Sequence, residues 1–166
     1  MEKLSINTKC QVFTPPKNAQ DLLNAVGYKE NVYGKKVSEN SCGDGSILAE
    51  IVERYIKDAL KHQHKIDEIK VGLEQDIWGA EIDKSHIANC KIRLDEVAAS
   101  FGLSDVSWNI FEGDFLRENI VRKFDFVIGN PPYITYKELN LEDRIFVRKS
   151  FETCSKGKFD YYYAFI

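Results

Sequence analysis

The chain has 166 residues, of which 43% are hydrophobic and 30% charged. This length and composition suit one globular domain with a single core, and they exclude two full-sized domains, disordered chains and low-complexity sequences. Because 23 Lys and Arg residues stand against 26 Asp and Glu residues, a net charge of −3, no general basic surface indicates a polyanion partner. Any contact with nucleic acid is expected to be local or to lie outside this chain.

Cysteine usage and the amino-terminal sequence indicate a cytoplasmic protein. Cys10, Cys42, Cys90 and Cys154 form no Cys-x-x-Cys pair, which favours free thiols in a reducing compartment. No apolar signal-peptide segment follows Met1, and no apolar run approaches about 18 residues, so neither secretion nor a membrane span is expected.

Helical and strand-like patterns alternate along the chain, which is typical of a parallel α/β sheet. A short helix is predicted to be closed by Gly27, and a longer one to follow Ser46 over residues 47–60, because apolar residues recur there at helical spacing. Between these helices, residues 36–41 are a weaker strand candidate, chosen mainly because a glycine-rich turn and a helix follow. Residues 61–75 are polar and ambiguous.

Three further strands are predicted over residues 77–82, 106–111 and 124–129, with a helix over residues 84–101. Each of the four strands runs into a polar or glycine-rich cluster. Open α/β sheets bind ligands at the carboxyl ends of their strands, near the point where the strand order reverses, so the clusters predict one shared site.

The cluster after the first strand, residues 39–46, reads Glu-Asn-Ser-Cys-Gly-Asp-Gly-Ser. Its two glycines permit a tight turn and a close approach of a ligand to the backbone, although a simple turn is an equal alternative. No Gly-Lys-Ser/Thr sequence follows, which disfavours a phosphate-binding Walker loop.

Glu81 and Asp114 are candidate ligand-binding carboxylates after the second and third strands. Glu81 can accept hydrogen bonds from both hydroxyls of a ribose; the alternative is a solvent-facing residue at the start of the next helix, where Asp83 can cap without it. Asp114 can accept from an exocyclic amine or merely cap residues 115–118.

The fourth cluster, Asn130-Pro-Pro-Tyr, is the most informative. Two consecutive prolines fix the backbone and remove two N–H donors, which leaves a rigid array of acceptors. The side-chain oxygen of Asn130 and the carbonyl of Pro131 can then receive both hydrogens of one amino group, and Tyr133 offers a flat face for stacking. The alternative is a stiff loop.

Two other features give weaker predictions. His62 and His64 do not share a helix face, and no carboxylate or thiol completes a ligand set, so no metal site is predicted. The aromatic run at residues 161–166 is a candidate surface, but burial is the usual fate of such side chains.

Five short motifs, taken in order, resemble the amino-terminal half of an adenine-N6 DNA methyltransferase. Their order is that of the gamma arrangement, and the chain is similar to the methylase part of restriction-modification enzymes of the Eco57I type over about residues 11–165. One position departs from the family pattern, since Asn40 stands where proline is usual. The motifs are Phe13-Thr-Pro-Pro, Glu39-Asn-Ser-Cys-Gly-Asp-Gly, Gly79-Ala-Glu-Ile-Asp, Gly113-Asp-Phe and Asn130-Pro-Pro-Tyr.

The resemblance implies a Rossmann-like S-adenosylmethionine-dependent methyltransferase fold, with a mostly parallel sheet that is incomplete in this chain. Residues 1–166 would form the amino-terminal part of the catalytic domain, without a target-recognition domain. The implied cofactor is S-adenosylmethionine, and the implied partner is double-stranded DNA, contacted through regions largely missing here. The oligomeric state stays open.

The resemblance also assigns site roles position by position. The residues implied at the methionine end of the cofactor are Phe13, Thr14 and Pro15, and those around its amino-acid portion and ribose are Glu39, Ser41, Cys42 and Gly43. Glu81 would bind the ribose hydroxyls, with Ile82 against the adenine ring. Asp114 would accept from the amino group of that adenine, beside the ring of Phe115. The residues implied to receive the target adenine are Asn130, Pro131, Pro132 and Tyr133.

Accepting both N–H bonds of the target amine would make its nitrogen pyramidal and free the lone pair for attack on the methyl group, without a metal or a covalent intermediate. The target base would first leave the duplex. Rival interpretations are a protein glutamine-N5 methyltransferase, an RNA methyltransferase and a non-catalytic cofactor-binding subunit. The upstream Phe13-Thr-Pro element stands against the first of these, as does the absence of a helical substrate domain before the cofactor loop.

Overall fold

The computed structural model describes residues 13–118 and 121–165, which divide into two compact units. The first, Phe13–Asn130, is called the sheet unit; the second, residues 131–165, is called the C-terminal unit. Each has its own buried residues, and each is described by itself. The length of the chain alone does not predict this division.

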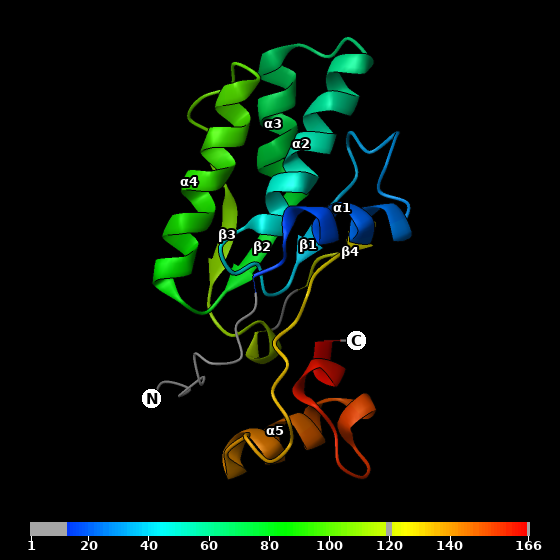
Figure 1. Cartoon of the computed structure of the whole chain (residues 1–166), viewed down its shortest axis with the longest axis vertical. Helices are drawn as coiled ribbons and strands as arrows, with labels where there is room; N and C mark the ends of the chain where they lie inside the picture. Colours follow the sequence, from blue (N-terminus) through cyan, green and yellow to red (C-terminus); the bar gives the residue numbers. More distant parts are fainter. Residues whose placement is uncertain (1–12, 119–120, 166) are drawn as a thin grey trace. The chain divides into compact units, whose positions relative to one another are not determined.

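The sheet unit contains four parallel strands in the order β3-β2-β1-β4 (Figure 1). They are β1 (Val37–Glu39), β2 (Ile77–Glu81), β3 (Asn109–Glu112) and β4 (Phe126–Val127). The first three strands are added in one direction and β4 on the other side of β1, so the strand order reverses between β1 and β4. This arrangement confirms the predicted parallel α/β sheet, and in open sheets of this kind ligands bind at the carboxyl ends of the strands near such a reversal.

Four helices of this unit lie beside the sheet: α1 (Pro16–Ala25), α2 (Ser46–Lys61), α3 (Ile66–Asp76) and α4 (Lys84–Ser100). Helix α2 packs against the other three. The sequence predicted α1, α2 and α4 but left the segment that forms α3 ambiguous. None of the helices in the described part of the chain is long and apolar enough to cross a bilayer.

All four strands are shorter than predicted: β1 by three residues, β2 by one, β3 by two and β4 by four. The segment before β3 does not pair as a strand: the main-chain N–H of Ser107 donates to Glu74 Oε1 at 2.9 Å, and that of Ile110 to the carbonyl of Trp108 at 3.0 Å. Strand β4 begins two residues after its predicted start and has only two residues, although the N–H groups of Asp125 and Phe126 both donate to the carbonyl of Lys36, directly before β1.

The core of the sheet unit lies between α2 and the strands. Helix α2 contributes a continuous apolar face to this core, and the first residues of β1 and β2, Val37 and Ile77, contribute their side chains. Gly79 lets the helix approach, because a Cβ atom there would lie 2.9 Å from the side chains of both Leu48 and Ile110. The buried apolar residues of α2 are Ile47, Leu48, Ile51, Val52, Tyr55, Ile56 and Ala59.

Helix α1 ends in a Schellman motif, as its predicted closing glycine requires. Gly27 adopts a left-handed φ of 80°, its N–H donates to the carbonyl of Asn24 at 3.3 Å, and the N–H of Tyr28 donates to that of Leu23 at 2.9 Å. Pairing of these carbonyls ends the helix without leaving buried acceptors unbonded.

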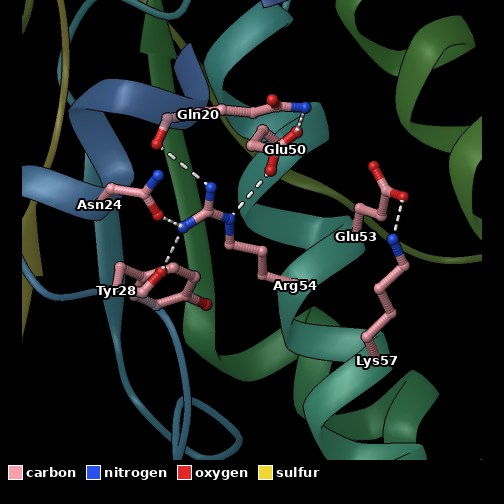
Figure 2. Close-up of polar contacts among 7 residues, drawn as sticks. All are labelled: Gln20, Asn24, Tyr28, Glu50, Glu53, Arg54 and Lys57. Atoms are coloured by element: carbon pink, nitrogen blue, oxygen red, sulfur yellow. Dashed lines mark hydrogen bonds and ion pairs between the residues drawn. The ribbon is translucent and has the colours of Figure 1, made fainter. Parts of the chain in front are cut away.

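Arg54 of α2 binds the carboxyl end of α1 (Figure 2). Its guanidinium donates to the carbonyls of Tyr28 at 2.9 Å and Gln20 at 3.2 Å, and to Asn24 Oδ1 at 2.9 Å. The same group pairs with Glu50 one turn earlier at 2.9 Å. A cation at this end of a helix is favoured by the helix dipole, so Arg54 fixes α1 on α2.

The C-terminal unit consists of α5 (Leu141–Ser150) and two 3-10 helices, η3 (Glu152–Cys154) and η4 (Tyr161–Phe165). Asn140 caps α5, accepting from the N–H of Asp143 at 2.8 Å. The buried apolar side chains of this unit are Ile134, Leu139, Val147, Cys154, Phe159, Tyr161 and Ala164, and Asp143 is its buried carboxylate.

Candidate functional site

The carboxyl ends of the strands bring the predicted clusters of the sheet unit together. The N–H of Gly43, in the turn after β1, donates to Glu81 Oε2 at 2.8 Å. The N–H of Gly113, after β3, donates to the carbonyl of Glu81 at 2.9 Å. After β4, the N–H of Ile128 donates to the carbonyl of Ser38 at 2.9 Å and continues the pairing toward Asn130. These clusters therefore lie along one edge of one sheet.

The turn between β1 and α2 depends on left-handed glycines. Gly43 has φ 52° and Gly45 φ 81°, and the N–H of Gly45 closes the turn on the carbonyl of Cys42 at 2.8 Å. A Cβ atom on Gly45 would lie 2.6 Å from the sulfur of Cys90 in α4. Half-buried Ser41 lies in the same turn. The chain thus approaches α4 closely here and presents backbone at the sheet edge.

The side chain of Cys42 points into the core. Its thiol is 4% exposed, and a hydrogen bond with Cys90, together with burial, raises its pKa. Its main-chain N–H donates to the carbonyl of Ala80 at 2.9 Å. Cys42 therefore shapes the turn and directs no side-chain group toward its open side.

Glu81 is a buried carboxylate that accepts from three main-chain N–H groups in two segments of the chain. It is 7% exposed; Oε1 accepts from the N–H groups of Ile82 and Asp83, each at 2.9 Å, while Oε2 accepts from Gly43. Asp83 caps α4 by accepting from the N–H of Ser85 at 2.8 Å. Asp83 thus performs the capping that was the alternative role for Glu81, and Glu81 Oε2 has room for one further donor.

Glu39 is the most deeply buried carboxyl of this edge, at 2% exposure. Burial is the main cause that raises its pKa well above the ordinary value, and the carboxylate of Glu81 adds to it. Its Oε2 atom has no hydrogen-bond partner among the described residues. Because an unpaired buried oxygen is costly, this atom marks a position where a ligand donor would be stabilised.

Phe13 covers the glycine turn. Its ring is 47% exposed and would lie 3.5 Å from a Cβ atom on Gly43, with its edge against the ring of His86 at a centroid distance of 5.3 Å. Pro15 follows as the residue directly before α1, and proline begins the helix itself. The segment 13–15 therefore lies over the turn that the sequence assigned to the same site.

Thr14 contacts Asn130 across a separation of 116 residues, since Asn130 Nδ2 donates to Thr14 Oγ1 at 3.3 Å. A Cβ atom on the preceding residue, Gly129, would lie 3.6 Å from the Cγ atom of Glu39. The start of the unit, the turn after β1 and the end of β4 thus meet at one place. The Oδ1 atom of Asn130 keeps its acceptor capacity.

Asp114 caps the residues that follow it, which was the alternative interpretation of this position in the sequence. Oδ1 accepts from the N–H of Leu116 at 3.0 Å and Oδ2 pairs with Arg117 at 3.2 Å, so Asp114 caps the 3-10 helix η2 (Phe115–Arg117). The ring of Phe115 packs at 6.3 Å from that of Trp78. These contacts place both residues at the carboxyl end of β3 without excluding the predicted adenine contact.

His86 is a residue of this edge that the sequence analysis missed. Its Nδ1 atom is buried without a hydrogen-bond partner among the described residues and lies 4.0 Å from Glu81 Oε1. Its position in the first turn of the helix that follows Glu81 is the sequence feature that could have identified it. His62 instead contacts the carbonyl of Asp58, and His64 stacks on Tyr33. No cluster of metal-ligating side chains occurs in residues 13–118 or 121–165.

The remainder of the Asn130-Pro-Pro-Tyr motif belongs to the C-terminal unit. Pro131 and Pro132 are half-buried, whereas the Tyr133 side chain is 58% exposed. The next residue, Ile134, is buried and accepts through its carbonyl from the N–H of Tyr161 at 2.8 Å. The motif therefore ends in an exposed ring on an anchored backbone.

An open pocket of about 570 Å³ lies at the opposite edge of the sheet unit, beside the amino ends of the strands. Its lining includes Lys36, Asp76, Asn109 and Phe124. None of the predicted site residues lines it, and its walls mix acidic and basic side chains. The chemistry of the carboxyl edge is therefore separate from this pocket.

A parallel sheet in this order, with a glycine turn and carboxylates at the carboxyl edge, defines a Rossmann-like fold of the kind found in S-adenosylmethionine-dependent methyltransferases. Comparison with solved structures agrees. A protein described as a class I S-adenosylmethionine-dependent methyltransferase from Listeria monocytogenes matches with a TM-score of 0.59 at 16% identity, over 98% of this chain and 43% of that one. This likeness shows the fold.

The chain belongs to the Eco57I restriction-modification methylase family, whose pattern it matches over residues 28–166. Type II methyltransferase M.BstVI of Geobacillus stearothermophilus is 29% identical over 167 residues, covering 93% of this chain and 30% of that protein. Modification methylase CviBIII of Paramecium bursaria Chlorella virus NC1A is 29% identical over 122 residues, covering 74% and 25%. The chain thus spans less than a third of the length of either relative. Family membership confirms the resemblance and implies S-adenosylmethionine as the cofactor.

Proposed function

We propose that the chain is the amino-terminal part of the catalytic domain of a DNA adenine-N6 methyltransferase of a restriction-modification system. The observation that carries the proposal is the position of Asn130, held by Thr14 at the carboxyl edge with its amide oxygen available as an acceptor. Relatives named as type II methyltransferases support the restriction-modification context.

The residues of the carboxyl edge fit S-adenosylmethionine. Glu39 offers a buried oxygen without a partner among the described residues, suited to a positively charged or N–H donor, and Glu81 Oε2 can accept one more hydrogen bond, suited to a ribose hydroxyl. The left-handed turn at Gly43 presents backbone, and the half-exposed ring of Phe13 offers an apolar wall over it. When bound, the cofactor supplies an electrophilic methyl group on sulfur.

Asn130 and Pro131 would act on the target amine by accepting both of its N–H bonds. The lone pair of an aromatic amine is delocalised into the ring, so the nitrogen attacks poorly in its planar form. Two fixed acceptors favour a pyramidal nitrogen whose lone pair is available, and such preorganised dipoles cost no reorganisation during the reaction. The structure supports this role through the bond that restrains the Asn130 amide.

Tyr133 would stack on the target base after it leaves the duplex. Extruding a base costs a few kcal/mol, and stacking on an aromatic ring offsets about 1–3 kcal/mol of it. The 58% exposure of Tyr133 supports this proposal, since its ring is accessible. A protein glutamine or RNA methyltransferase would use the same amine chemistry, and the identity of the methylated product separates these alternatives.

The test uses the full-length gene product, unmethylated DNA and a cofactor carrying an isotopically labelled methyl group. Mass spectrometry of the digested nucleosides should find labelled 6-methyladenine. Label in cytosine, or label in RNA or protein offered as substrate in parallel reactions without label in DNA, would overturn the adenine assignment.

The variant Asn130→Ala should lower methyl transfer by about a hundredfold or more, with the cofactor Kd changed by no more than about threefold. Asn18→Ala is the matched control, because Asn18 is an exposed asparagine of α1. An equal loss of cofactor affinity and rate in Asn130→Ala would show that Asn130 supports folding or the cofactor instead.

A further inference from the structure

The three consecutive tyrosines at residues 161–163 have no role in the proposed function so far. They form most of η4 in the C-terminal unit, where Tyr161 is buried and Tyr163 is 38% exposed. Tyr162 lies between them, and its ring contacts that of Tyr133 at a centroid distance of 5.7 Å and an interplanar angle of 53°. The tyrosine run therefore lies against the exposed end of the Asn-Pro-Pro-Tyr motif.

A backbone bond fixes this contact. The N–H of Tyr161 donates to the carbonyl of Ile134 at 2.8 Å, directly after Tyr133 in the chain. Both Ile134 and Tyr161 are buried, so the two segments share one small core. The ring contact and the backbone bond together restrain Tyr133 from two sides.

Tyr162 is itself supported from behind. The ring of Tyr163 lies 4.5 Å from it at an angle of 31°. Thr153 of η3 holds this helix in turn, since its hydroxyl donates to the carbonyl of Tyr163 at 2.6 Å. Three rings thus follow one another, and Tyr133 is the last and most exposed of them.

An exposed tyrosine loses rotamer freedom when it stacks on a ligand, which weakens binding unless the ring is already held. We propose that Tyr162 is a positioning residue that holds the Tyr133 ring ready to stack on an extruded target base, an inference that rests on the proposed function. Tyr162 itself touches neither cofactor nor base in this proposal. By holding the Tyr133 ring, Tyr162 would speed the step in which the target base of the bound DNA is extruded.

The experiment compares Tyr162→Ala, Tyr162→Phe and Tyr163→Ala in the full-length gene product, with kcat, the KM for DNA and the cofactor Kd as measurements. An aromatic pair contributes about two- to tenfold in an equilibrium, so Tyr162→Ala should lower kcat by about that factor with the KM for DNA and the cofactor Kd nearly unchanged. Tyr162→Phe keeps the ring and should restore kcat. Tyr163→Ala removes a ring of the same kind, which contacts Tyr162 rather than Tyr133. Its kcat should fall by less than half as much as the kcat of Tyr162→Ala.

A second substrate separates positioning from simple structural damage. A mismatch opposite the target adenine lowers the cost of extruding it, so it should restore most of the rate lost in Tyr162→Ala. A loss that the mismatch leaves unchanged, a wild-type rate in Tyr162→Ala, or an equal loss in Tyr163→Ala would each overturn the inference alone. Absence of adenine methylation by the unsubstituted protein would overturn the proposed function and the inference with it. If Tyr162→Ala fails to fold, Tyr162→Leu keeps bulk without a ring and has the same expected and refuting outcomes.

Discussion

Replacing Arg54 by methionine should destabilise the sheet unit by about 2–3 kcal/mol. The change removes three charged hydrogen bonds, two to the carbonyls of Gln20 and Tyr28 and one to the exposed side chain of Asn24 (Figure 2). The two bonds to carbonyls contribute about 1 kcal/mol each, below the roughly 1.5–3 kcal/mol of hydrogen bonds to charged groups, because the Arg54 side chain keeps 15% exposure. The bond to the exposed Asn24 side chain adds little. The pair with Glu50 adds about 0.5 kcal/mol. Methionine retains most of the apolar contact of the stem, so the loss reports the polar contacts.

Thermal unfolding followed by circular dichroism measures this loss. A change of 2–3 kcal/mol corresponds to a fall in Tm of about 4–12 °C for a chain of this size. Lys57→Met is the matched control from the same helix: Lys57 pairs with Glu53 at 2.5 Å, but their side chains are 60% and 38% exposed. Such a pair contributes at most about 0.5 kcal/mol. Equal losses in the two variants, or full stability in Arg54→Lys, which lacks the planar fork, would refute the reasoning.

Two buried carboxyls should affect stability with opposite dependence on pH. Burial raises the pKa of Asp58, but main-chain hydrogen bonds from Tyr33, Asn31 and Val32 outweigh this effect and leave the pKa below its ordinary value. The contribution of Asp58 to the free energy of unfolding should therefore be complete above about pH 4, and it should be lost as the pH falls through the folded-state pKa. Asp58→Asn should flatten the acid side of the stability curve, and an unaltered acid side would contradict this. Because burial raises the pKa of Glu39, its contribution should decline as the pH rises above about 4. Glu39→Gln should therefore raise Tm at pH 7 and weaken cofactor binding in calorimetry, whereas a lower Tm would disprove the cost assigned to its ionised form.

The sequence predicts elements best where a local signal and the packing agree. Helix α2 begins one residue before its predicted start, because the glycine turn and the apolar face both favour a helix there. The sequence did not predict helix α3, because its apolar stripe is narrow, with Ile69 and Leu73 buried. In addition, the start of this helix depends on a side-chain hydrogen bond, in which Glu68 accepts from the N–H of Lys65 at 2.9 Å. Such a helix is stabilised mainly by tertiary packing, which no short window of sequence contains.

The position of the candidate site at the sheet edge was predictable from the sequence, but the hydrogen bonds and side-chain directions there were not. Parallel topology alone brings the ends of β1, β2 and β3 to one edge, so Glu81 and the glycine turn were expected together. That Glu81 would accept from three main-chain groups, and that Cys42 would direct its thiol to Cys90, depends on how α4 packs against the turn. Side-chain direction at a turn is set by packing between elements, which spacing in the sequence does not reveal.

The bond between Thr14 and Asn130 gives the Phe-Thr-Pro element a task that its own sequence does not disclose. An amide group has a donor end and an acceptor end, and the proposed reaction requires the acceptor. Because Asn130 Nδ2 donates to Thr14, the oxygen is the end left for a substrate amine. The adjacent Phe13 lies over Gly43 in the turn that would hold the cofactor. In the proposed reaction, this short segment before α1 would orient the amide for one reactant and cover the turn for the other, which would be a physical reason for these distant motifs to occur in the same chain.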